Sequence, residues 1–112
     1  MEVKDAVKAA VEAIRDKKGE DIKVFYIADV SPLADYFILA TGNNRNQIQA
    51  MSDEIDAALA KLNVHSKQIE GYDSANWILC DYGDFMVHIF NPESREFYNL
   101  ERLWKDAKQE EF

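Results

Sequence analysis

Hydrophobic side chains in the first half of the chain follow a helical spacing and then a strand spacing. Residues 3 to 18 carry apolar side chains three or four positions apart, as on one face of a helix. The members of this stripe are Val3, Val7, Ala10 and Ile14. Residues 22 to 28 predict a short strand that ends before Pro32, and residues 36 to 41 predict an apolar strand buried on both faces. A helix followed by two strands is therefore expected.

The second half of the chain predicts a helix, three strands and a last helix. The first of these helices starts after Gly42 and ends near residue 62, with apolar side chains again at helical spacing. Its stripe consists of Ile48, Met51, Ile55, Leu59 and Leu62. Residues 64 to 69, 77 to 81 and 84 to 90 have strand patterns, and a final helix is predicted from about Leu100.

This order of elements predicts a single α/β domain over residues 1–112. The strand–helix–strand unit at residues 36 to 69 is expected to be a right-handed parallel crossover, whereas the terminal hairpin is antiparallel. We therefore expect a mixed sheet of about five strands with helices packed on it.

The hairpin at residues 77 to 90 has two chemically different faces. A two-residue loop at Tyr82-Gly83, with glycine for a positive φ, would pair Asp81 with Asp84 and Cys80 with Phe85. Opposed residues share a face, and the faces alternate along each strand. One face is then purely apolar, with Ile78, Cys80, Phe85, Val87 and Ile89. The other face has Trp77 opposite His88, Leu79 opposite Met86, and the two aspartates at the tip.

The composition fits a globular protein that needs no disulfides. Apolar residues make up 47% of the chain, and the single cysteine, Cys80, excludes a disulfide framework and favours a reducing compartment. The chain shows neither a charged-then-apolar leader nor an apolar run of bilayer length. We therefore expect a cytoplasmic protein that does not bind membranes.

Acidic residues dominate the charge. The chain has 21 acidic and 13 basic side chains and a formal net charge of −8. This balance disfavours nucleic-acid backbones, so we expect no direct sequence-specific binding of nucleic acid. It favours a basic protein partner through electrostatic steering, although acidity that only keeps the protein soluble explains the composition equally well.

The residue patterns do not favour catalysis, a metal site or a cofactor. His88 and Cys80 could form a nucleophile–base pair, but they are predicted on opposite faces of the hairpin. A buried Cys80 and a surface His88 are expected instead. Asp81 and Asp84 could hold a divalent cation, but aspartates that form the turn explain the pair better. We expect no catalytic residue, no metal ligand and no cofactor.

The mixed face of the hairpin has the composition of a protein interface. Trp77, Leu79 and Met86 are apolar anchors among carboxylates, and tryptophan is the residue most enriched in binding hot spots. The alternative is that the last helix covers this face through Leu103 and Trp104. The residues alone leave both interpretations open.

Blocks of residues along nearly the whole chain carry a family resemblance. In the first half they are Asp29-Val30-Ser31, residues 34–38, Thr41-Gly42 and residues 45–47. In the second half they are Glu70-Gly71 and residues 75–77, 81–84, 87–90, 95–98 and 100–104. From Val3 to about Ala107 these blocks resemble the ribosomal silencing factor family, which is related to the Iojap protein of plants.

The resemblance implies a bacterial protein that binds the large ribosomal subunit. In that family the partner is a large-subunit ribosomal protein, number fourteen in the bacterial series. A family member bound to this ribosomal protein sterically blocks the joining of the small subunit. Translation is thereby repressed under nutrient limitation or in stationary phase. Members are similar in fold to the nucleotidyltransferases, but this sequence lacks the Gly-Ser and the paired strand aspartates of active ones.

The resemblance and the face composition together predict a partner-binding site on the hairpin. Its expected apolar anchors are Trp77, Leu79 and Met86, and its expected acidic contacts are Asp81, Asp84 and Glu70. Tyr82 and His88 are expected to add polar contacts. Four further family residues are expected to pin the C-terminal helix to the sheet: Arg95, Tyr98, Glu101 and Trp104. A homodimer could use the same face. The alternative functions are a metal-dependent nucleotidyltransferase-like enzyme and an RNA-binding module.

Overall fold

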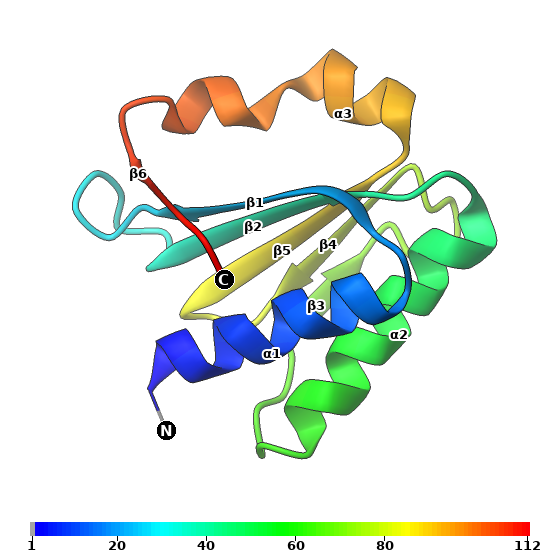
Figure 1. Cartoon of the computed structure of the whole chain (residues 1–112), viewed down its shortest axis with the longest axis horizontal. Coiled ribbons are helices and arrows are strands. Elements are labelled where there is room, and N and C mark those ends of the chain that lie inside the picture. Colours follow the sequence, from blue (N-terminus) through cyan, green and yellow to red (C-terminus); the bar gives the residue numbers. More distant parts are fainter. Residues whose placement is uncertain (1) are drawn as a thin grey trace.

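The computed structural model describes residues 2–112, which form helices on both faces of one sheet (Figure 1). The helices are α1 (Val3–Asp16), α2 (Arg45–Ala60) and α3 (Pro92–Tyr98), and a 3₁₀ helix, η1, spans Leu100–Trp104. The strands are β1 (Glu20–Tyr26), β2 (Tyr36–Thr41), β3 (Gln68–Glu70), β4 (Trp77–Asp81), β5 (Phe85–Phe90) and β6 (Lys108–Glu110).

The strands form a mixed sheet in the order β3-β4-β5-β2-β1-β6. β2 and β5 pair in parallel at the centre, and the other neighbours pair antiparallel. The predicted α/β domain with a mixed sheet is therefore confirmed. The sheet has six strands rather than about five, because the polar segment Lys108–Glu110 pairs with β1 although its sequence has no strand pattern.

Helices α1 and α2 cover one face of the sheet, called here the inner face, and α3 with η1 covers part of the outer face (Figure 1). Both long helices turn an apolar stripe to the sheet, as predicted. An asparagine caps the N-terminus of α2 and of α3. The side chains of Asn44 and Asn91 accept hydrogen bonds from backbone N–H groups in the first turn of these helices.

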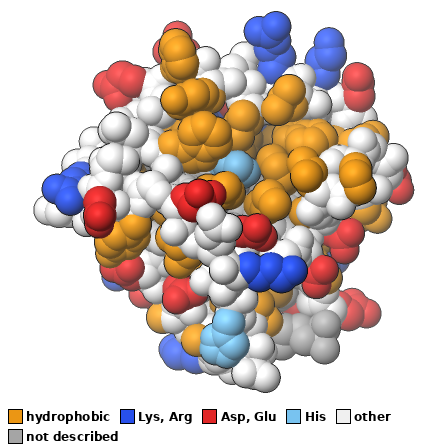
Figure 2. Space-filling view, turned by 180° about the vertical axis from the view of Figure 1, so that it is seen from behind, with side chains coloured by type: hydrophobic (Ala, Val, Ile, Leu, Met, Phe, Trp, Pro, Cys, Tyr) orange, Lys and Arg blue, Asp and Glu red, His pale blue; other side chains and the backbone are white. Residues whose placement is uncertain are grey.

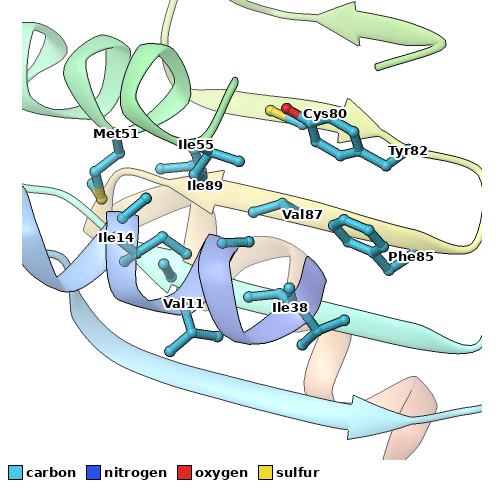
Figure 3. Packing of buried hydrophobic residues seen from close by; sticks show 14 of the residues in the cluster. Val11, Ile14, Ile38, Met51, Ile55, Cys80, Tyr82, Phe85, Val87 and Ile89 are labelled. Atoms are coloured by element: carbon cyan, nitrogen blue, oxygen red, sulfur yellow. The ribbon is translucent and has the colours of Figure 1, made fainter. Parts of the chain in front are cut away.

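The inner core contains the apolar face of the hairpin. Ile78, Cys80, Phe85, Val87 and Ile89 are all buried there, against residues of α1 and α2 such as Val11, Ile14, Met51 and Ile55 (Figure 3). The predicted division of the hairpin into an apolar and a mixed face is therefore confirmed.

The predicted pairing inside the hairpin is wrong by two residues. Trp77 pairs with Phe90 and Leu79 with His88, because the loop is Gly83-Asp84 rather than Tyr82-Gly83. The N–H of Tyr82 donates to the carbonyl oxygen of Phe85 at 3.0 Å, and Gly83 has a φ of +86°. Glycine as the first loop residue matches a type II′ turn. A shift of two residues changes partners but preserves faces, so Cys80 and His88 remain on opposite sides.

The last part of the chain differs from the single helix predicted from about Leu100. α3 starts earlier, at Pro92, and ends at Tyr98, followed by the cap residue Asn99 with a left-handed φ of 44°. The 3₁₀ helix η1 follows, and then β6. Asn91-Pro92 therefore does more than end a strand, since an asparagine cap with proline at the first helical position is a helix-start signal.

The crossover through α2 joins two strands that run in the same direction, β2 and β3, as predicted. These two strands are not neighbours in the sheet, however. β4 and β5 lie between them, which places β3 at the edge of the sheet. β3 and β4 therefore lie toward the opposite edge of the sheet from β1 and β6, whereas η1 contacts β1 and β2 through Glu101 with Lys23 and Trp104 with Phe37.

Candidate protein-binding face

The outer face of the sheet is covered progressively less toward the β3 edge. The register places Glu70, Leu79, His88 and Leu39 in one row across β3, β4, β5 and β2. Leu39 is fully buried, His88 is 4% exposed, Leu79 is half-buried and Glu70 is exposed. Side chains of β4 are therefore reachable by a partner, whereas those of β2 belong to the core.

Trp77 lies where covered and open parts of this face meet. Its indole stacks on Phe90 at a centroid distance of 5.2 Å and packs against Tyr98 of α3 at 4.6 Å. The side chain is half-buried, so part of the ring is supported from below and part faces solvent. Leu79 and Met86 are half-buried as well. The three expected apolar anchors thus share one partly open face.

His88 is inside the protein, and the expectation of a surface histidine is wrong. Its ring packs against Phe37 at a centroid distance of 4.7 Å and against Trp77 at 5.8 Å. Its Nδ1 accepts a hydrogen bond from Nε1 of Trp77 at 3.0 Å. Burial lowers the pKa of His88 from 6.5 to about 4, so the ring is neutral near pH 7. Phe37 of β2, which is itself covered by Trp104, packs on the His88 ring, and this packing explains the difference.

The acidic side chains lie around the anchors. Glu70, Gly71, Trp77 and Leu79 line a shallow groove of about 270 Å³ between β3 and β4. Asp84 is exposed at the hairpin tip, and Asp81 is half-buried with a carboxylate oxygen that accepts a hydrogen bond from the Gly83 N–H at 2.8 Å. The structure therefore brings Glu70 beside Trp77 and Leu79, while the two aspartates mark the other end of the face.

Tyr82 lies on the inner side, away from the other predicted site residues. Its hydroxyl donates to the Asp56 carboxylate of α2 at 3.0 Å, and its ring stacks on Phe85 (Figure 3). Burial raises its pKa, and only 6% of the residue is exposed. Its hydroxyl is already engaged, and we leave Tyr82 out of the proposed site. Cys80 beside it is also buried, which raises the pKa of its thiol to about 11.

One exposed aromatic side chain, Phe97, was not singled out from the sequence. Phe97 is 81% exposed, and Tyr98 bridges from Phe97 to Trp77. Of the two residues expected as an alternative cover of this face, Trp104 packs on the outer face, whereas Leu103 is 68% exposed. Figure 2 shows hydrophobic side chains gathered over the half of the molecule that carries α3, with carboxylates and a histidine among them. The helix-start signal at Asn91-Pro92 could have indicated that Phe97 is exposed. In a helix that buries Arg95, the residue two positions later lies on the opposite, solvent-facing side.

A second pocket lies at the carboxyl ends of the parallel strands β2 and β5. It has a volume of about 470 Å³, and four carboxylates and a buried arginine are among the residues that line it: Glu20, Asp21, Glu96, Glu101 and Arg95. Arg95 donates to Thr41 at 2.8 Å and to Glu101 at 3.0 Å, and Lys23 lies 3.1 Å from Glu101. These contacts hold α3 and η1 on the sheet.

The described part of the chain contains neither a metal cluster nor a membrane helix. Within residues 2–112, three or more histidines, cysteines or acids never come together in a way that could hold a metal ion. In the same range, every helix is too short or too polar to cross a bilayer.

The comparison with known proteins assigns the family. The family model for ribosomal silencing factor during starvation matches residues 1–112. The chain belongs to the ribosomal silencing factor family. A Bacillus subtilis protein named ribosomal silencing factor RsfS is 41% identical over 107 residues, which cover 96% of this chain and 91% of that protein. The resemblance read from the residue blocks is therefore confirmed.

Two further relatives extend the comparison. A crystal structure of a protein from Chromobacterium violaceum superimposes with a TM-score of 0.91 at 33% identity, and the match covers all of this chain and 92% of the other. A mouse protein named mitochondrial assembly of ribosomal large subunit protein 1 is 31% identical over 97 residues, which are 84% of this chain and 42% of the mouse protein. The fold of this family member is thus shared with solved bacterial structures.

Proposed function

We propose that this family member binds the large ribosomal subunit and sterically blocks the joining of the small subunit. The contact is made to a basic large-subunit protein, number fourteen in the bacterial series, under nutrient limitation or in stationary phase. The observation that carries the proposal is the partly open tryptophan of the hairpin, supported on Phe90 and Tyr98 and set among carboxylates. The name of the mouse relative, which refers to assembly of the large subunit, points to the same particle.

The proposed contact uses apolar anchors inside an acidic rim. Trp77, Leu79 and Met86 give the apolar centre, and a half-buried tryptophan on a rigid strand loses little conformational freedom on binding. Glu70, Asp81 and Asp84 give the rim that attracts lysine and arginine side chains. The net charge of −8 repels the surrounding ribosomal RNA and thereby favours the protein component.

Occlusion needs affinity and bulk rather than reacting groups. The protein extends 34 × 33 × 23 Å along its principal axes, so a copy seated on the subunit-joining face fills space that the small subunit requires. Buried Cys80 and buried His88 lie on opposite faces of the hairpin and take no part in chemistry with one another.

Sedimentation with separated ribosomal subunits tests the proposal. The tagged protein should travel with large subunits and not with small ones, and its addition should reduce the formation of joined ribosomes. Cosedimentation with neither subunit, or undiminished joining at saturating protein, would contradict it.

The acidic rim can be tested by charge reversal with a matched control. Lysines in place of Asp81 and Asp84 should slow association with large subunits, most strongly at low salt. Lysines in place of Glu12 and Asp16, exposed on α1, change the net charge equally on the opposite layer. Equal slowing by both double variants would show that only net charge matters.

A further inference from the structure

We infer that His88 is a positioning residue, which holds the indole of Trp77 in the orientation that meets the partner, and does not itself touch the partner. The inference rests on the proposed function, and it replaces the direct polar contact expected from the sequence. His88 is 4% exposed, whereas Trp77 in front of it is half-buried. A partner on this face therefore reaches the indole and finds the imidazole behind it.

The geometry of the contact fixes the tryptophan ring. Nε1 of Trp77 donates to Nδ1 of His88 at 3.0 Å, and the two rings lie 5.8 Å apart. Trp77 and His88 are diagonal neighbours on adjacent strands, because Trp77 pairs with Phe90 and His88 with Leu79. The hydrogen bond adds a polar restraint to the stack on Phe90, so rotation of the indole about its side-chain torsions is opposed at both its face and its edge.

His88 itself is held more tightly than the indole it supports. Its ring lies 4.7 Å from that of Phe37 and stacks on Phe90 at 6.2 Å. Because Nδ1 accepts from Trp77, the ring hydrogen of neutral His88 is on Nε2. The buried acceptor His88 thus lies behind the partly open donor Trp77. Such an arrangement holds a binding residue in its bound orientation before the partner arrives.

The stability of the fold does not explain a histidine at this position. Nε2 of His88 is buried and has no hydrogen-bond partner among residues 2–112, which is unfavourable for a polar group. Among the same residues, the hydrogen bond that the imidazole makes is the one to Trp77. An apolar ring would fill the space between Phe37, Phe90 and Trp77 without that cost. The polar atom therefore serves Trp77 rather than the core.

Two substitutions separate the acceptor from the ring. His88→Phe keeps an aromatic ring and removes the acceptor. His88→Asn removes the ring and keeps an oxygen two bonds from Cβ, where Nδ1 stands in histidine. If His88 only fills space, phenylalanine should bind like the wild type and asparagine should bind worse. If His88 positions Trp77, the order is reversed.

The experiment measures the indole in the free protein and the affinity for purified large ribosomal subunits. Exchange of the Trp77 indole N–H with solvent, followed by NMR and assigned with Trp104→Phe, should be slow in the wild type and in His88→Asn and faster in His88→Phe. Affinity for large subunits should fall about three- to ten-fold in His88→Phe, the range of one ordering hydrogen bond, and less in His88→Asn. The thermal midpoint of His88→Phe should stay level or rise.

The outcomes distinguish the inference from the proposed function. Wild-type affinity in His88→Phe, in a protein whose Trp77→Ala variant binds poorly, would overturn the positioning role and leave the proposed site intact. Failure of the wild type to bind large subunits would refute the proposed function. In that case the exchange rate of the Trp77 indole N–H would still test the inference. A rate in His88→Phe equal to that of the wild type would refute the role of His88 in orienting Trp77.

Discussion

Neutral burial of His88 gives the stability of the fold a pH dependence. Burial lowers the pKa of His88 from 6.5 to about 4. Between these two values the unfolded chain binds a proton at His88 and the folded protein does not, so lowering the pH favours unfolding. The free energy of unfolding should therefore be highest above about pH 6.5 and fall as the pH drops toward 4.

The size of this effect follows from the depth of burial. A pKa difference from 6.5 to about 4 corresponds to about 3 kcal/mol of unfolding free energy once both states are protonated. At about pH 5 the unfolded chain is protonated at this site and the folded protein is largely not, so about 2 kcal/mol is already lost. A loss of this size is a large fraction of the stability of a small domain.

Urea denaturation of the wild type and of His88→Phe at about pH 7.5, 6 and 5 measures the effect. All other side chains are common to both proteins, so the difference between the two profiles isolates His88. As the pH falls, the unfolding free energy of His88→Phe should rise relative to that of the wild type, by about 2 kcal/mol at about pH 5. Parallel pH profiles of the two proteins would refute the neutral burial of His88.

Three further outcomes follow from other contacts. Cys80 is buried with a pKa of about 11, so a thiol reagent should label it in native protein only at the rate of unfolding, and fast labelling would contradict its core position. Arg95→Ala should lower the unfolding free energy by about 2 kcal/mol, because Thr41 and Glu101 lose the hydrogen bonds of a buried guanidinium while Glu101 keeps Lys23; a urea midpoint like that of the wild type would contradict this. Gly71→Ala should cost more than about 1 kcal/mol in the same assay, since Gly71 has a φ of +79° and a methyl group there meets the Trp77 carbonyl; unaltered stability would mean that this turn relaxes freely.

Much of the sheet was predictable because its strands have strong local patterns. Tyr36–Thr41 reads as an unbroken apolar run, and the structure buries every residue of it. The two faces of the hairpin also followed from alternation alone. The pairing did not, because Tyr82-Gly83 and Gly83-Asp84 are both acceptable two-residue loops, and only the packing of Tyr82 against α2 distinguishes them.

The segment after α3 could not be predicted because tertiary contacts decide its structure. Leu100–Trp104 forms a 3₁₀ helix held by Glu101 contacts with Arg95 and Lys23 and by Trp104 on Phe37. Lys108–Glu110 is polar and becomes a strand only because the edge of β1 is available. These contacts also bury Phe37, and through it His88, which is why that histidine could not be placed from the hairpin alone.

The site was predictable in composition but not in its internal roles. Trp77, Leu79 and Met86 share a partly open face, and Glu70 lies opposite Leu79, as expected for one surface. Tyr82 was misassigned because it was placed in the loop; as a residue paired with Phe85 it lies on the inner face with Cys80, where its hydroxyl donates to Asp56 of α2. The exposed Phe97 belongs to a helix that started eight residues earlier than the predicted one.

The central claim is that the Trp77 face binds the large ribosomal subunit, and one affinity measurement tests it most directly. Purified large subunits are titrated with wild-type protein, with Trp77→Ala and with Leu62→Ala, a large-to-small change on the opposite layer. Trp77→Ala should weaken binding by about 2 kcal/mol or more, the range of a hot-spot residue, while Leu62→Ala binds like the wild type. Wild-type affinity in a folded Trp77→Ala protein would contradict the claim.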